Sequence, residues 1–160
     1  MTPGRIRSFD LSPDGTRMLV KADGSGPPQP WIVPLDGSRA GVSECGGPDL
    51  VEDARTLPPT WRRRAADWIG DVDDPADCER LRQASPAAHA DQIRAPLLLI
   101  HGTNDTRVAI GPTDAFHARL VELGKPVTYW RVDGAGHVIA QQQAGFEAAT
   151  CDWLAEHLLG

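Results

Sequence analysis

The segment APLLLIHG, residues 95–102, carries the strongest structural signal in the chain. A continuous apolar run of this kind is typical of a central parallel strand that is covered on both faces. Downstream, residues 113–124 and 139–159 place apolar side chains at helical spacing, and PVTYWRVD, residues 126–133, is typical of a strand. The order strand, helix, strand, helix predicts the α/β class, with a mostly parallel sheet inside a three-layer architecture.

Upstream of this strand the pattern also alternates. AGVSECG, residues 40–46, predicts a short buried strand, whereas residues 60–70 and 76–84 predict helices separated by an Asp-rich turn. The Gly-Gly-Pro sequence after the short strand does not favour the start of a helix. We expect Trp61 and Trp68 to pack inward, and the arginines beside Trp61 to form a solvated helix face.

The first 38 residues follow a different pattern. Polar and apolar positions alternate around turn signals, which predicts three short strands, near residues 5–10, 16–21 and 31–35. The turn SPDG, residues 12–15, joins the first two. We therefore divide the chain into a β-strand segment, residues 1–38, and an α/β segment, residues 39–160.

Composition and charge exclude several classes of function. The chain has 160 residues, of which 41% are hydrophobic, enough for the core of one domain. Its formal net charge of -6 argues against nucleic acid or an anionic membrane as a partner, because both need clustered cations. No apolar run has the length of a signal peptide or of a membrane span. Three widely spaced cysteines indicate reduced thiols, and we expect a cytoplasmic protein.

Two titratable residues follow consecutive strands of the predicted sheet. Asp105 lies in the loop HGTNDTRV, and His137 lies in the loop DGAGH. Because the carboxyl ends of parallel strands border one crevice, we expect the two side chains to meet there. Acyl transfer by a serine needs such a pair: the histidine accepts the hydroxyl proton, and the acid fixes its tautomer. The alternative is a turn-capping carboxylate and a loop histidine without a partner.

The sequence around Asp105 resembles the prolyl oligopeptidase family of serine peptidases. Residues 85–108, SPAAHADQIRAPLLLIHGTNDTRV, contain the family's Ser-Pro, apolar strand, His-Gly-x-x-Asp and Arg-Val elements in order. The spacing of 32 residues from Asp105 to His137 also fits the family. FDLSPDGTRMLV, residues 9–20, resembles a blade segment of the β-propeller that precedes the catalytic domain in that family.

This resemblance implies that residues 39–160 are the C-terminal part of an α/β-hydrolase catalytic domain, similar to acylaminoacyl peptidases and dipeptidyl peptidases. By the resemblance, Asp105 is the orienting acid and His137 the general base of a Ser-Asp-His triad. Such a triad hydrolyses short peptides or acylated amino acids and needs no cofactor. An esterase or a dienelactone-hydrolase-like enzyme is an alternative, since one fold hosts several acyl-transfer reactions.

The nucleophile of this triad has no clear candidate in the sequence. A hydrolase nucleophile usually lies in Gly-x-Ser-x-Gly between a strand and a helix, and no such motif is present. Ser43 in GVSECG comes closest, but Cys45 replaces the second glycine. We therefore expect no hydrolysis by the chain alone, and we interpret residues 37–41 as the junction of an internal deletion. A non-catalytic relative that binds peptides or a protein partner is the alternative.

The five histidines do not indicate a metal site, because they form no i, i+4 pairs and HExxH is absent. His101, at the end of a strand, is instead expected to be packed or hydrogen-bonded. The sequence holds about three hydrolase strands where the fold normally has about eight, so we expect an open sheet edge. Such an edge allows self-association.

Overall fold

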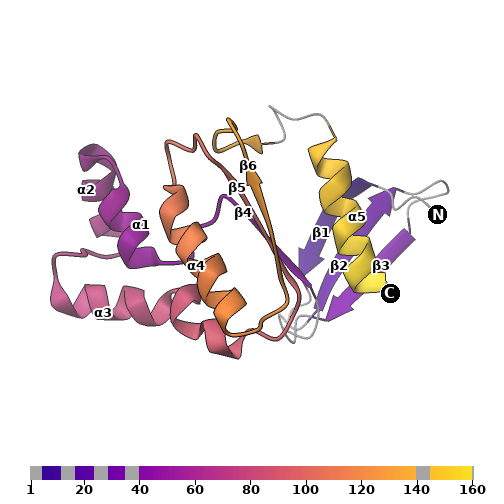
Figure 1. Ribbon diagram of the computed structural model, residues 1–160, viewed down its shortest axis with the longest axis horizontal. Helices are drawn as coiled ribbons and strands as arrows, with labels where there is room; N and C mark the ends of the chain where they lie inside the picture. The colour runs from indigo at the N-terminus through magenta and orange to yellow at the C-terminus, as the bar shows by residue number, and fades with distance from the viewer. Residues whose placement is uncertain (1–4, 12–16, 24–28, 35–39, 140–144, 160) are drawn as a thin grey trace.

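The computed structural model describes residues 5–11, 17–23, 29–34, 40–139 and 145–159, which contain two three-stranded sheets (Figure 1). One sheet is antiparallel and consists of β1 (Arg5–Leu11), β2 (Arg17–Asp23) and β3 (Gln29–Pro34). The other is parallel and consists of β4 (Gly41–Glu44), β5 (Leu97–Gly102) and β6 (Val127–Val132), with β5 in the centre. The predicted strands are confirmed, while the turn at residues 12–15 lies outside the described residues.

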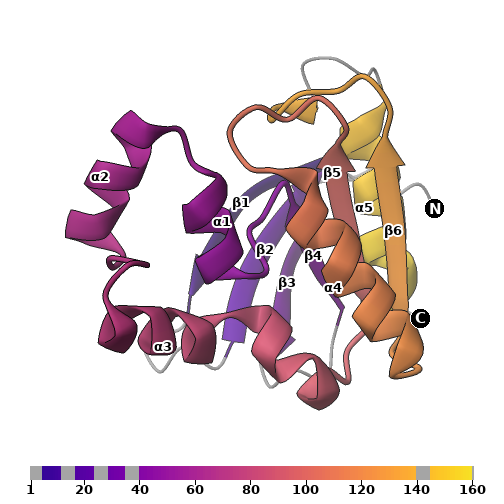
Figure 2. The same ribbon diagram turned by 60° about the vertical axis from the view of Figure 1, so that its left-hand side comes forward.

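Helices accompany the two sheets in the described part of the chain. Between β4 and β5 lie α1 (Leu50–Thr56), α2 (Pro59–Trp68), α3 (Pro75–Ala84) and the 3-10 helix η1 (Pro86–Gln92). Helix α4 (Ile110–Glu122) connects β5 to β6, and α5 (Phe146–Leu159) follows β6. Helices α4 and α5 lie on opposite sides of the parallel sheet (Figures 1 and 2), and α5 also contacts β1 of the other sheet.

The central strand β5 is buried from both faces. Leu98 and Ile100 pack in one apolar cluster with Trp153 of α5, and Leu99 packs in another with Phe116 of α4. Successive side chains of a strand point to opposite faces, so this apolar run supplies both clusters. The three β5 side chains are at most 2% exposed, and burial of each contributes about 1.5–3 kcal/mol to folding.

Helix α1 begins where the sequence pattern did not favour a helix. Asp49 is its N-cap: the carboxylate accepts hydrogen bonds from the amides of Val51 and Glu52, each 3.1 Å long. The amide of Leu50 is held by Ser85 Oγ at 2.9 Å. The Gly-Gly-Pro sequence is thus a short linker before an aspartate cap, and the expectation that no helix starts here is wrong.

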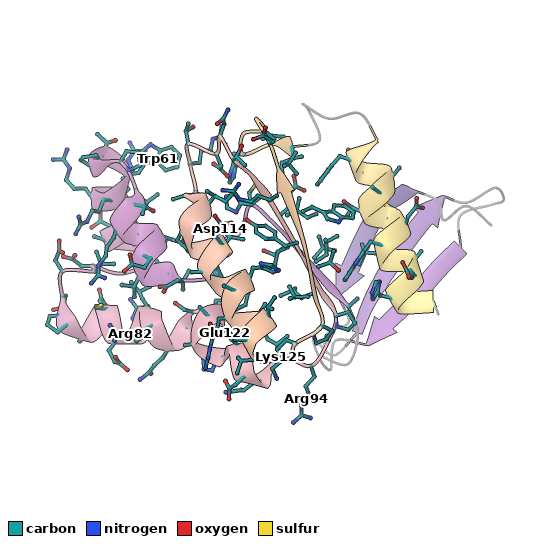
Figure 3. All side chains as sticks on the ribbon, viewed as in Figure 1. Trp61, Arg82, Arg94, Asp114, Glu122 and Lys125 are labelled. Atoms are coloured by element: carbon teal, nitrogen blue, oxygen red, sulfur yellow. The ribbon has the colours of Figure 1, made fainter. Side chains whose placement is uncertain are left out.

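Helix α2 is largely exposed. Trp61 is 60% exposed and lies on α2 at the periphery of the molecule (Figure 3), so the prediction that it packs inward is wrong. The side chain of Trp68 lies outside the described residues. Arg62 forms an ion pair with Asp73 at 2.7 Å, which agrees with a solvated basic face. Helix α2 packs against α1 and lies away from the parallel sheet (Figure 1), and this explains the exposure of Trp61.

The ends of the parallel sheet bear on two predictions. Among the described residues, β4 and β6 each pair with β5 alone, so each leaves one edge without a strand partner. Self-association through such an edge stays a prediction, as does the division of the chain after residue 38. No helix in the described part of the chain is both long and apolar enough to cross a membrane.

Candidate active site

Asp105 and His137 lie together at the carboxyl end of the parallel sheet. Strands β5 and β6 pair in parallel, with Gly102 beside Val132, so the loops that follow them lie at the same end of the sheet. Asp105 Oδ2 lies 2.8 Å from His137 Nδ1. The structure therefore brings together the two side chains that the sequence selected as a candidate acid and base.

The two oxygens of Asp105 have different partners. Oδ1 accepts hydrogen bonds from the amides of Arg107, at 2.8 Å, and Val108, at 3.0 Å. Oδ2 is the oxygen that faces His137. The carboxylate thus caps its own loop with one oxygen and orients the imidazole with the other, so the turn-capping alternative and the pairing with His137 both hold.

The environment of Asp105 favours its charged form. Its side chain is 0% exposed, and burial by itself raises the pKa of a carboxyl group. The hydrogen bonds from the Val108 amide, from His137 and from the Arg107 amide outweigh burial and lower the pKa below its ordinary value. Asp105 is therefore an anion at neutral pH.

The contact with Asp105 determines which nitrogen of His137 carries the proton. A carboxylate accepts hydrogen bonds, so Nδ1 of the ring donates, and Nε2 is the nitrogen that can accept a proton. The His137 side chain is 32% exposed, whereas Asp105 is covered. An oriented, partly accessible imidazole on a buried carboxylate has the geometry of a general base.

His101 is a second buried histidine beside the Asp105 carboxylate. Its side chain is 0% exposed, and Nε2 lies 3.4 Å from Asp105 Oδ2. Nε2 also lies 3.1 Å from the carbonyl oxygen of Val108, so this nitrogen is a donor. Nδ1 lies 2.9 Å from Thr113 Oγ1 on α4. The prediction that His101 is packed and hydrogen-bonded is confirmed.

Cys45 completes a buried cluster with His101 and Asp105, whose ligand atoms all lie within 4.8 Å of one another. The set suits a zinc ion by residue type. However, His101 Nε2 already donates to a carbonyl, and Nδ1 is engaged by Thr113. Burial, the largest effect, raises the pKa of the Cys45 thiol to about 11. Both nitrogens of His101 are thus held within the protein, and Cys45 is packed beside the acid.

Sequence reasoning did not find the role of Cys45. Its backbone is left-handed, with φ of 46°, directly after β4, and its side chain is buried. This conformation is rare in residues other than glycine, and the Cys45 thiol lies at the carboxyl end of the sheet, near Asp105. The contact joins residues 60 positions apart, so no local spacing reveals it.

The backbones of the two loops approach closely at Gly102. A Cβ atom at this position would overlap the carbonyl oxygen of Ala135 and would lie 2.6 Å from that of Gly136. Only glycine leaves room for the loop that carries His137.

The structure describes the side chains of two serines, Ser43 and Ser85. Ser85 is 2% exposed, donates to the carbonyl of Leu81 and accepts from the amide of Leu50, so it is a structural residue. Ser43 lies in β4, and no hydrogen bond joins it to His137 among the described residues.

Residues 39–160 match the prolyl oligopeptidase family. Dipeptidyl peptidase family member 6 of Caenorhabditis elegans is 32% identical over 111 residues, and dipeptidyl aminopeptidase BIII of Pseudoxanthomonas mexicana is 33% identical over 130 residues. These alignments cover 67% and 78% of this chain but only 15% and 19% of the relatives. The acylaminoacyl peptidase of Pyrococcus horikoshii superposes with a TM-score of 0.64 at 23% identity, over 76% of this chain and 20% of that one. This likeness supports an α/β-hydrolase fold.

Proposed function

Because the chain belongs to the prolyl oligopeptidase family, we propose that Asp105 and His137 are the acid and the general base of a serine-peptidase site. The proposed substrates are short peptides or acylated amino acids, in line with the names of the relatives. The observation that carries the proposal is the contact of 2.8 Å between Asp105 Oδ2 and His137 Nδ1 at the ends of neighbouring parallel strands.

The geometry suggests how the pair acts. His137 Nε2 takes the proton of the serine hydroxyl as the oxygen attacks the substrate carbonyl, and it later passes that proton to the leaving amine. Asp105 keeps the proton of the neutral ring on Nδ1 and stabilises the imidazolium. The lowered pKa of Asp105 supports this role, because the carboxylate stays ionised while the ring is protonated.

We propose in addition that the serine is not supplied by the residues of this chain. Ser85 is committed to structural hydrogen bonds, and Ser43 has none with His137 among the described residues. A fluorophosphonate probe tests this on the whole chain, because it forms a covalent adduct with an activated serine. We expect no stoichiometric adduct, and an adduct on any serine would overturn this part of the proposal.

A chimera tests the roles of the pair. Residues 39–160 would replace the matching segment of dipeptidyl aminopeptidase BIII, which would supply a serine nucleophile. We expect the chimera to hydrolyse dipeptide anilides, and Asp105→Asn and His137→Ala to reduce kcat at least about a thousandfold. His89→Ala, at an exposed histidine, is the matched control and should leave kcat unchanged. Equal activity of His137→Ala and the parent chimera would refute the assignment.

A non-catalytic peptide-binding protein is the second candidate, favoured by the lack of a serine hydrogen-bonded to His137 among the described residues. Calorimetry with short peptides separates the two: binding by this chain, together with an inactive chimera, would favour it. Turnover of p-nitrophenyl esters but not of peptide anilides by the chimera would instead indicate an esterase.

The three cysteines, Cys45, Cys78 and Cys151, are free. Free thiols support the proposal that the protein resides in a reducing compartment such as the cytoplasm.

A further inference from the structure

The loops that carry Asp105 and His137 are joined by contacts that do not involve either side chain. The amide of Thr103 donates to the carbonyl of Val132 at 3.0 Å. The amide of Asn104 donates to the carbonyl of Ala135 at 2.9 Å. These two hydrogen bonds hold Val132 and Ala135, the residues on either side of the turn at residues 133–134.

The side chain of Thr103 holds the turn itself. Thr103 Oγ1 accepts a hydrogen bond from the amide of Gly134 at 2.9 Å and donates one to Asp133 Oδ1 at 3.2 Å. A hydroxyl can donate and accept at the same time, and this turn requires both. Gly134 has φ of 72°, a conformation that glycine adopts readily but has no intrinsic reason to keep.

We propose that Thr103 is a positioning residue for His137. Its hydroxyl holds Asp133 and Gly134 in the turn that precedes the histidine, so that Nδ1 points at Asp105. The inference rests on the proposed function, since it assigns a role within the same site. It implies that the loop that contains Thr103 and Asp105 holds His137 in place, and that this arrangement needs neither a nucleophile nor a substrate.

Two substitutions at residue 103 test this in the whole chain. Thr103→Val keeps the shape of the side chain but removes the hydroxyl, and Thr103→Ser keeps the hydroxyl. The readout is the rate at which the His137 Nδ1 proton exchanges with water, measured by NMR on protein labelled with 15N-histidine. We expect exchange to be roughly three- to tenfold faster in Thr103→Val, as for the loss of one hydrogen bond, and within about twofold of the parent in Thr103→Ser.

Asp133→Ala provides a second variant at an exposed position. It removes the acceptor of the Thr103 hydroxyl and leaves the Gly134 amide bond, so we expect a smaller acceleration than in Thr103→Val. A purely structural role would lower the melting temperature without changing this exchange rate. Exchange within twofold of the parent in Thr103→Val, or equal acceleration by valine and serine, would overturn the proposal.

This measurement is independent of hydrolysis. If the chimera shows that His137 has no catalytic role, the proposed function fails while the exchange rates still report whether Thr103 orients the ring. If the exchange rates do not respond but the chimera depends on Asp105 and His137, only the role of Thr103 is lost.

Discussion

Both carboxylate oxygens of Asp53 are buried, and within the described part of the chain neither accepts a hydrogen bond of normal geometry. Its pKa is raised from 3.8 to about 6, mainly by burial and in part by the negative charges of Asp49 and Glu52. The folded state thus binds this proton more tightly than the unfolded state. The resulting penalty on folding is absent below about pH 4, grows up to about pH 6, and is complete above that value.

Asp53→Asn should therefore stabilise the protein at pH 7.5. A pKa shift of this size corresponds to about 3 kcal/mol, which we reduce to about 1–2 kcal/mol because the residue is partly accessible. Urea unfolding at pH 7.5 and at pH 4 measures the difference, and the gain should disappear at the lower pH. Asp67→Asn, at an exposed carboxylate on α2, is the matched control. A gain that is equal at both pH values would exclude a titration effect.

Asp105 has the opposite dependence. Its pKa is lowered in the folded state, so its contribution to stability is present above the ordinary pKa of 3.8 and is lost as the pH falls through the folded value. Asp105→Asn should cost about 1.5–3 kcal/mol at neutral pH, the range for hydrogen bonds to a charged group. The difference between the variant and the parent should shrink as the pH falls below 3.8 and through the lowered pKa of the folded state. A difference that stays constant from pH 7 to pH 2 would contradict the charged state of Asp105.

At the scale of residues, the sequence predicted the pair and missed its surroundings. Asp105 and His137 could be paired because each follows a strand and parallel strands end at one edge. The buried contacts of Cys45 and the burial of the Asp53 carboxylate depend on which helix covers which loop. This long-range packing cannot be predicted from the local spacing of residues.

At the scale of elements, the end of β5 and the loop that carries His137 approach each other most closely at Gly102. Gly102→Ala should displace that loop, because the new Cβ would meet the backbone carbonyls of Ala135 and Gly136. We expect a loss of about 1–3 kcal/mol in unfolding free energy, together with faster exchange of the His137 Nδ1 proton.

The control for this glycine lies in helix α4. At Gly111 an added Cβ would meet no atom within 4 Å, so Gly111→Ala should be neutral or stabilising by up to about 1 kcal/mol. Equal effects of the two alanines on stability and exchange would show that the close approach at Gly102 is unimportant.

The elements themselves were predictable where one pattern dominates. The apolar run of β5 and the helical spacing of α4 both gave correct assignments, and Gly124, with φ of 63°, follows the end of α4. The start of helix α1 was not predicted because the two glycines and the proline before it resemble a loop, although Asp49, which follows them, is a strong N-cap. Trp61 was misplaced because the size of an apolar side chain does not say whether a neighbouring element is there to cover it.

At the scale of the molecule, the sheet order makes β5 the most protected strand. It pairs on both sides, whereas β4 and β6 each pair on one side among the described residues. Native-state hydrogen exchange should be slowest for β5 amides and should approach global unfolding there. If copies of the chain associate through an open edge, the outer amides of β4 or β6 should gain protection as protein concentration rises. Uniform protection of all three strands in dilute protein would contradict this sheet order.

The family and the fold class could be derived from the sequence because the strand, loop and helix signals of residues 85–137 agree with one another. The arrangement of the N-terminal antiparallel sheet beside α5 could not, since it depends on long-range packing. The chain spans less than a fifth of the length of the two dipeptidyl peptidase relatives. That it acts on the same class of substrates as these longer proteins is therefore a proposal.

The tautomer of His137 shows whether Asp105 orients the imidazole ring. 15N NMR of the histidine-labelled chain at pH 8.5 reports which ring nitrogen carries the proton. We predict a protonated Nδ1 with a far-downfield proton resonance, an unprotonated Nε2, and the loss of that resonance in Asp105→Asn. A ring protonated at Nε2, or an Nδ1 signal that is the same in Asp105→Asn, would show that Asp105 does not orient His137.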